Sequence, residues 1–144
     1  MPEVAIRDVT VSDSPALARL LAQLGYPAGV AQVARRLARL EASAADRLLV
    51  AEVDGEVVGL ASLHVSPSLE YDGDAGKVSA LVVDERYRRR GIGEALLRSV
   101  EAAARERGCV LLFLTTAERR KDAHAFYRRV GLAETGRRFA KPLE

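Results

Sequence analysis

The stretch "KVSALVVDERYRRRGIGEALL", Lys77 to Leu97, sets the organisation of this chain. It begins with aliphatic and β-branched residues from Val78 to Val83, which predict a strand. A loop from Glu85 to Arg90 follows. Apolar residues then recur at helical spacing, which predicts a helix from Ile92 to Arg107. A strand, a loop and a helix therefore follow one another directly.

Two glycines mark the junction between the loop and the helix. Because Gly91 and Gly93 have no Cβ, an anion can approach the main chain closely where helix amides and the helix dipole favour negative charge. The third glycine of a dinucleotide-binding fingerprint is missing, and so is the Gly-Lys-Ser/Thr end of a Walker loop. The residues alone leave three interpretations: a phosphate-binding loop, a nucleic-acid patch of arginines, or a solvated helix start.

The residues before this stretch predict three strands and two helices. Val4 to Val9 alternates as a strand, and a helix begins at Ser14-Pro15 and ends at Gly25. A second amphipathic helix runs from Val30 to Leu40. Two apolar strands then meet at Asp54-Gly55, a strong hairpin signal.

The residues after the helix complete the predicted fold. "CVLLFLTT" from Cys109 is a continuous apolar run and predicts a strand buried on both faces. "RKDAHAFYRRVG", ending at Gly131, predicts a short helix, and "LAETGRRFAKPL" predicts a terminal strand with an irregular end. The order of elements predicts one α/β domain over residues 1–144, with a mixed, mostly antiparallel central sheet and helices on both faces.

The composition excludes several classes of function. The chain has 144 residues, 49% of them apolar, which is enough for one core. Its 22 basic and 20 acidic residues leave a formal charge of +2, so nucleic acid is not an expected partner. The single cysteine, Cys109, is expected to be a small core residue and fits a reducing compartment. The N-terminus has no long apolar run, so we expect a cytoplasmic protein without a membrane anchor.

Two motifs resemble those of one enzyme family. Arg88 to Gly93 has the pattern Arg/Gln-x-x-Gly-x-Gly/Ala, and "AHAFYRRVGL", Ala123 to Leu132, is similar to Ala-x-x-Phe-Tyr-x-x-x-Gly-Phe. These are the hallmarks of the GCN5-related N-acetyltransferases (GNAT family), in the family's order. The resemblance extends over nearly the whole chain. The C-terminal part looks most like the small-molecule branch that includes aminoalkylphosphonate acetyltransferases.

The resemblance implies acetyl-coenzyme A as cosubstrate and direct transfer to an amine. Tyr127 corresponds to the tyrosine that acts as general acid toward the departing thiolate. Arg120 stands where many members have an asparagine that contacts the cofactor. Phe126 is expected to pack in the core. The residues that the resemblance assigns to coenzyme A are Leu81, Val82, Val83, Arg88, Arg89, Arg90, Gly91, Ile92, Gly93, Arg120 and Phe126.

The acceptor side is left open by the sequence. The expected acceptor is a primary amine of a small molecule, and an amine needs a base to lose its proton. The candidate bases are Glu70, Asp72, Asp74 and His64, whereas His124 is expected to pack locally. Lys77 stands where the aminoalkylphosphonate branch has an acidic residue, which weakens a phosphonate or metal-assisted assignment. Arg137-Arg138 could bind an acidic acceptor but are expected to be solvated.

Other functions compete with this interpretation. No metal-ligand spacing stands out, so no metal is expected. A homodimer is expected from the family alone. The alternatives are a non-catalytic acyl-CoA-binding or sensing module, and an enzyme that acetylates protein or peptide amines.

Overall fold

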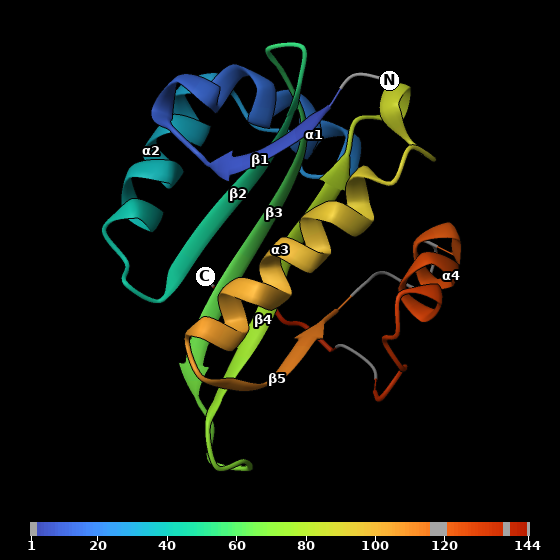
Figure 1. Cartoon of the computed structure of the whole chain (residues 1–144). Helices are drawn as coiled ribbons and strands as arrows, with labels where there is room; N and C mark the ends of the chain where they lie inside the picture. The colour runs from blue at the N-terminus through green and yellow to red at the C-terminus, as the bar shows by residue number, and fades with distance from the viewer. Residues whose placement is uncertain (1–2, 116–120, 137–138, 144) are drawn as a thin grey trace.

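The computed structural model describes residues 3–115, 121–136 and 139–143, and Figure 1 shows their arrangement. Five strands, four α-helices and two short 3₁₀ turns alternate along this part of the chain. In chain order they are β1 (Val4–Asp8), η1 (Val11–Asp13), α1 (Ser14–Leu24), α2 (Val30–Glu41), β2 (Asp46–Val53), β3 (Glu56–Pro67), β4 (Asp74–Val83), η2 (Glu85–Tyr87), α3 (Ile92–Glu106), β5 (Cys109–Leu114) and α4 (Lys121–Arg129).

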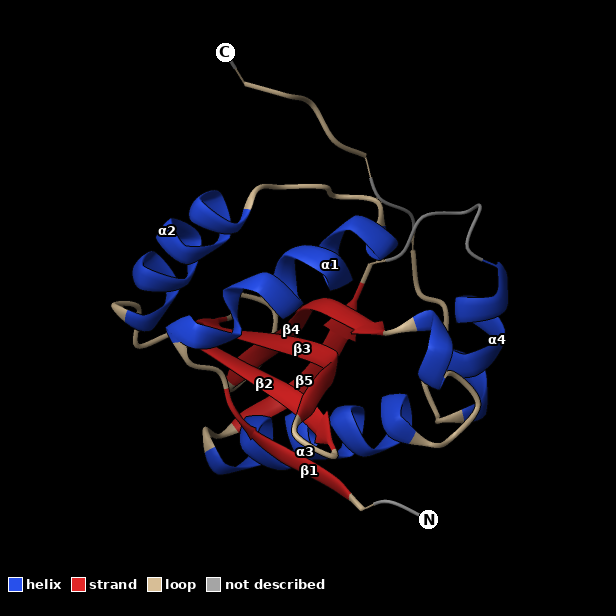
Figure 2. Ribbon diagram, turned by 90° about the horizontal axis from the view of Figure 1, so that it is seen from above, coloured by secondary structure: helices blue, strands red, loops and turns tan. Residues whose placement is uncertain are grey.

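The strands form one mixed sheet in the order β1-β2-β3-β4-β5. The first four strands are antiparallel and β5 is parallel to β4, which confirms the predicted mixed, mostly antiparallel sheet. The β2–β3 hairpin turns at Asp54 (φ 50°) and Gly55 (φ 79°), which confirms the expected Asp-Gly turn. Helices α1 and α2 lie on one face of the sheet and α3 on the other (Figure 2).

Each face of the sheet has its own hydrophobic core. On one face Leu96, Leu97 and Val100 of α3, all at most 1% exposed, pack against β-strand residues such as Leu63. On the other face the apolar stripes of α1 and α2 cover Val50, Val57, Leu60 and Val82. The helical spacing read from the sequence therefore marks the buried sides correctly.

Two expectations about the C-terminal third are wrong. The first is that β5 is buried on both faces: Val110, Leu111 and Phe113 are 56%, 37% and 38% exposed. The reason is that β5 lies at the edge of the sheet, and its pairing in the described chain is with β4. The second is the terminal strand, because the described residues of that segment, 132–136 and 139–143, form no strand.

Two smaller findings complete the fold. Strand β4 begins at Asp74, four residues before the predicted start at Val78. Within the described chain, no helix has the length and hydropathy needed to cross a bilayer.

Candidate active site

Strands β4 and β5 separate part of the way along β4. Their parallel pairing runs from Asp74 with Cys109 to Val78 with Leu114, and β4 then continues to Val83 paired with β3 alone. Figure 1 shows β5 turning away from β4 at this point, toward α4. A bulge lies at the start of the split: Leu63 pairs with Val78 and Ser62 with Ala80, so Ser79 has no partner residue on β3. From residue 79 to residue 83, the edge of β4 that faces β5 therefore has no strand partner in the described chain.

The upper end of this split leads to the start of α3. Gly91 precedes the helix with φ 78°, a conformation that favours glycine. The first helical hydrogen bond runs from the amide of Ala95 to the carbonyl of Gly91 at 3.0 Å. The amides of Ile92, Gly93 and Glu94 have no acceptor among the described residues. They are therefore free to bind an anion.

A buried carboxylate shapes the loop between β4 and α3. Asp84 is fully buried, and its amide donates to the carbonyl of Val58 at 2.8 Å. Its Oδ1 accepts from the Arg86 amide at 3.0 Å and from Arg86 Nε at 3.2 Å, and its Oδ2 accepts from Arg86 Nη2 and from Arg19 of α1. The hydrogen bond from Arg86, above all, lowers the pKa of Asp84 to about 2. The loop is thus tied to a charge that stays ionised.

A second carboxylate extends this cluster. Glu56, at the start of β3, accepts from Arg86 Nη2 at 2.6 Å and from the hydroxyl of Tyr87 at 3.2 Å. These contacts lower the pKa of Glu56, and the hydrogen bond from Arg86 has the largest effect. Arg86 is therefore engaged within the protein, which weakens the interpretation of the arginine run as a nucleic-acid patch. Sequence reasoning missed both carboxylates, although an Asp directly after a strand is a common turn residue.

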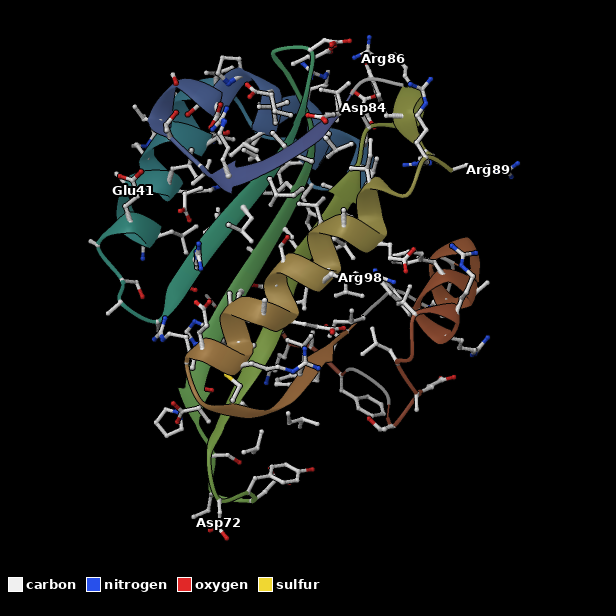
Figure 3. The ribbon with its side chains drawn as sticks, in the orientation of Figure 1. Glu41, Asp72, Asp84, Arg86, Arg89 and Arg98 are labelled. Carbon is white, nitrogen blue, oxygen red and sulfur yellow. The ribbon has the colours of Figure 1, made fainter. Side chains whose placement is uncertain are left out.

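The next three arginines face solvent. Arg88, Arg89 and Arg90 are all exposed, and the positions of Asp84, Arg86 and Arg89 are seen at the upper end of the sheet in Figure 3. Arg88 Nε donates to the carbonyl of Val83 at 3.3 Å, and the guanidinium of Arg90 stacks 5.0 Å from the ring centre of Tyr87. Arg89 has φ 66°, a left-handed backbone conformation that residues other than glycine rarely adopt.

Helix α4 brings two aromatic residues to the split. Tyr127 is 8% exposed and belongs to the same core as α3. Phe126 meets it edge-on, with ring centres 5.6 Å apart. A Cβ built on Gly93 would lie 3.4 Å from Phe126 Cζ and 3.6 Å from a methyl of Val83. Three residues from separate elements, Val83, Gly93 and Phe126, therefore meet at the mouth of the split.

The match to a family follows this geometry. Residues 15–132 match the sequence profile described as the acetyltransferase (GNAT) family. The chain belongs to this family. The resemblance seen in the two motifs is thereby confirmed, and the split sheet beside the free start of α3 is the GNAT fold.

The chain is also similar to several named proteins. Aminoalkylphosphonate N-acetyltransferase of Salmonella typhimurium is 41% identical over 90 residues, which are 62% of this chain and 58% of that protein. Aminoglycoside N(6')-acetyltransferase type 1 of Klebsiella aerogenes is 30% identical over 147 residues, covering 96% of each. A crystal structure of a transcriptional regulator from Bacillus halodurans superposes with a TM-score of 0.91 at 25% identity, over 98% of this chain and 100% of that one.

The remaining residues assigned to coenzyme A lie as follows. The side chains of Leu81 and Val82 are buried, one in each of the two cores. At these positions β4 therefore presents its main chain to the split between β4 and β5. Ile92 is 2% exposed and anchors the first turn of α3. Arg120, like Arg137 and Arg138, lies outside the described residues.

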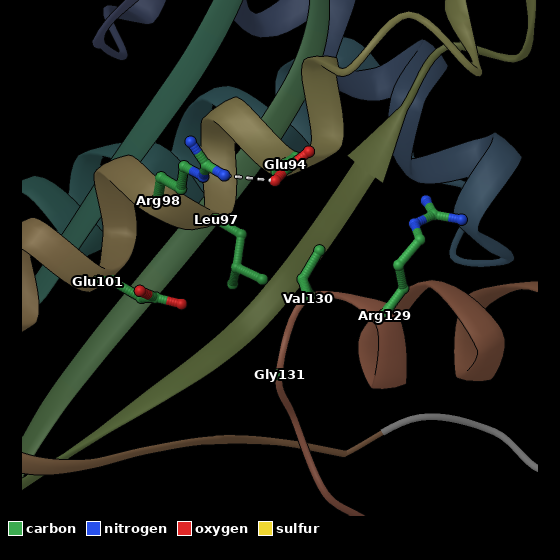
Figure 4. A pocket seen from close by; sticks show the side chains of 7 residues that line it. All are labelled: Glu94, Leu97, Arg98, Glu101, Arg129, Val130 and Gly131. Carbon is green, nitrogen blue, oxygen red and sulfur yellow. Dashed lines mark hydrogen bonds and ion pairs between the residues drawn. The ribbon is translucent and has the colours of Figure 1, made fainter.

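A cleft adjoins the start of α3. Its volume is about 350 Å³, and it lies between α3 and the end of α4 (Figure 4). It is therefore beside the loop of residues 88–93 and not in the split between β4 and β5. Charged side chains of both signs line it, and Arg98 Nη2 donates to Glu94 Oε1 at 2.7 Å. The lining residues are Glu94, Leu97, Arg98, Glu101, Arg129, Val130 and Gly131.

The candidate bases are distributed over the sheet. Glu70 and Asp72 are exposed in the β3–β4 loop, and Figure 3 shows Asp72 at the opposite end of the sheet from Arg89. Asp74 opens β4 at that same end. His64 lies on β3, where its Nδ1 is 2.9 Å from Asp46 Oδ1 of β2. His124 is half-buried on α4.

No group of three or more His, Cys, Asp or Glu side chains that could hold a metal ion occurs among the described residues. Cys109 is half-buried against the α3 core, and burial is the main cause that raises the pKa of its thiol.

Proposed function

We propose that this chain is an acetyl-CoA-dependent N-acetyltransferase that moves an acetyl group directly to a primary amine of a small molecule. The observation that carries the proposal is the split of β4 from β5, which ends at the free amides of α3. An unpaired strand edge offers main-chain groups to an amide-containing arm, and a helix N-terminus offers amides to a phosphate. Both features are arranged along one line.

The chain's own residues then divide the binding of coenzyme A. The amides of residues 92–94 and the exposed side chains of Arg88, Arg89 and Arg90 would hold the diphosphate, and the main chain of Leu81, Val82 and Val83 would pair with the pantetheine arm. Bound there, acetyl-CoA supplies an acetyl thioester. The half-buried ring of Phe126 supports the mouth of the split.

Tyr127 is the proposed general acid. Its phenol is buried on α4, beside the split, and a phenol retains its proton at neutral pH and can donate it to a departing thiolate. Because it acts when the carbon–sulfur bond breaks, its loss should lower kcat and leave coenzyme A affinity unchanged.

A thiol-release assay with acetyl-CoA over a panel of amines tests the proposal. The panel should contain aminoalkylphosphonates, amino acids, aminoglycosides and a short peptide, since relatives are named for the first three of these. Turnover should be fastest with a small molecule, and Tyr127→Phe should lower kcat by about 100-fold. Tight binding of coenzyme A without turnover of any amine would instead favour a non-catalytic acyl-CoA-binding module.

We also propose a homodimer. The outer edge of β5 carries exposed Val110, Leu111 and Phe113, and the same chain exposes Phe139 (93%) and Leu143 (91%). A second copy can cover both apolar surfaces, because the apolar side chains of the two copies can pack against one another and leave water. Sedimentation should give a dimer, and Phe113→Glu should give a folded monomer. A monomeric wild-type protein would contradict this part of the proposal.

A further inference from the structure

The sheet face that carries α1 and α2 is covered only in part. These helices contact β3 around Val57 and Leu60. Beyond Leu60 the side chains of β3 on this face are polar and partly exposed. Their partners on β4 are Ala80, Lys77 and Ala75. The open face carries Asp46, Ser62, His64, Ser66, Lys77 and Ser79.

A histidine and a carboxylate form a pair on this open face. His64 faces Asp46 across β2 and β3, and Nδ1 lies 2.9 Å from Oδ1. Asp46 is 14% exposed and His64 45%. Burial raises the pKa of Asp46, but hydrogen bonds from Ser43 and His64 outweigh it, so that the pKa is lowered. An ionised carboxylate only accepts hydrogen bonds, so Nδ1 carries the hydrogen and Nε2 of the neutral ring carries the lone pair.

The pair lies next to the closed end of the split. An extended arm that enters between β4 and β5 cannot pass Val78 and Leu114, where the two strands are paired again. Directly beside that point Ser79 Oγ meets Ser62 Oγ at 3.0 Å on the open face. His64 is two residues further along β3 on the same face, a separation of about 7 Å. His64 thus lies one register position beyond Val78, on the strand next to β4, and a proton can pass over such a separation through a bridging water molecule.

We propose that His64 is the general base of the acetyl transfer and that Asp46 is the residue that positions it. This inference rests on the proposed N-acetyltransferase function. The amine nitrogen forms a bond to the acetyl carbon and gives a proton to His64 Nε2. The carbon–sulfur bond breaks, and the sulfur takes a proton from the phenol of Tyr127. The imidazole then gives its proton to solvent, and the phenolate of Tyr127 takes one from solvent, before the next turnover.

Charged groups on neighbouring elements lie near the pair of His64 and Asp46. Asp46 faces it from β2, and Lys77 faces it from β4 as its cross-strand partner. Glu41, at the end of α2, lines a small cleft together with Asp46.

Steady-state kinetics with the best amine of the panel test the inference. At neutral pH the variant His64→Gln should lose about 100-fold in kcat. Its coenzyme A Kd and its melting temperature should be unchanged. Added imidazole should restore part of the rate of His64→Ala.

Asp46→Asn should lower kcat by about tenfold, because an amide can hold the ring in the other tautomer. Asp8→Asn is the matched control, since Asp8 pairs with Arg47 at 3.0 Å on the neighbouring strands and should leave kcat unchanged. A wild-type kcat in His64→Gln would overturn the inference while leaving the proposed function intact.

A measurement without catalysis covers the case in which no amine is turned over. Nitrogen-15 NMR of labelled histidine reports which ring nitrogen carries the hydrogen. Wild-type protein should show His64 with hydrogen on Nδ1, and Asp46→Asn should lose this preference. Hydrogen on Nε2 in the wild-type protein would overturn the inference independently of the proposed function.

Discussion

The guanidinium of Arg86 and the carboxylate of Asp84 form a double hydrogen bond, with Nε–Oδ1 and Nη2–Oδ2 distances of 3.2 Å each. Asp84 is fully buried, whereas the side chain of Arg86 is 58% exposed. The pair begins the loop that leads from β4 to the free amides of α3. An arginine within the basic run is thereby held for structure rather than for ligand binding.

Asp84→Asn should lower the free energy of unfolding by about 2–3 kcal/mol, because the variant leaves two guanidinium groups without their buried counter-charge. Coenzyme A should also bind more weakly, since the loop loses its anchor. Urea unfolding and calorimetric titration measure the two effects. Asp72→Asn is the control: Asp72 is exposed, and its loss should change stability by less than about 0.5 kcal/mol.

The contribution of Asp84 to stability should disappear in acid. Its pKa of about 2 lies below the value of about 3.9 for an unfolded aspartate, so the unfolded chain binds more protons between these values. The stabilisation is complete above pH 4 and is lost as the pH falls toward 2. The stability difference between wild type and Asp84→Asn should shrink by about 2 kcal/mol between pH 5 and pH 2. Parallel pH curves would contradict the prediction.

Arg89→Gly should stabilise the protein by about 0.5–1 kcal/mol, because a left-handed residue other than glycine is strained. The φ of 66° at Arg89 is the basis of this expectation. Arg89→Ala separates charge from strain: it removes the guanidinium but keeps the Cβ, and it should give no gain. Thermal unfolding of the three proteins decides whether the conformation or the charge matters.

Gly59→Ala should destabilise the fold by about 1–3 kcal/mol. A Cβ at this position of β3 would lie 2.9 Å from a methyl of Leu96 and 3.3 Å from the Cβ of Ala51, so α3 would have to shift. Gly29→Ala is the matched control, because its Cβ would meet only Gln32 at 3.6 Å. Equal melting temperatures for the two variants would show that α3 adapts at no cost.

Most of the fold could be predicted from local patterns. Helical spacing identified the stripes of α1, α2 and α3, and Asp54-Gly55 identified the hairpin, because both signals depend on neighbouring residues only. The apolar run of β5 misled, since a continuous run has the same appearance in a central strand as in an edge strand that a partner could cover.

The site was predictable to the same limited extent. Gly91 and Gly93 could be recognised as the start of an anion-binding helix, because their chemistry lies in the backbone. The roles of the surrounding charges could not be recognised. Arg86 finds Glu56 thirty residues away, and His64 finds Asp46 eighteen residues away.

The sequence by itself determined the order of elements, the hairpin, and the glycines that leave helix amides free, since periodicity and turn chemistry act over a few residues. Only the tertiary structure decided which cations are held by Asp84, that His64 acquires a carboxylate partner, and which apolar strand remains exposed at the sheet edge. Ion pairs and burial depend on which segments the sheet brings side by side. That arrangement exists only once the whole chain has folded.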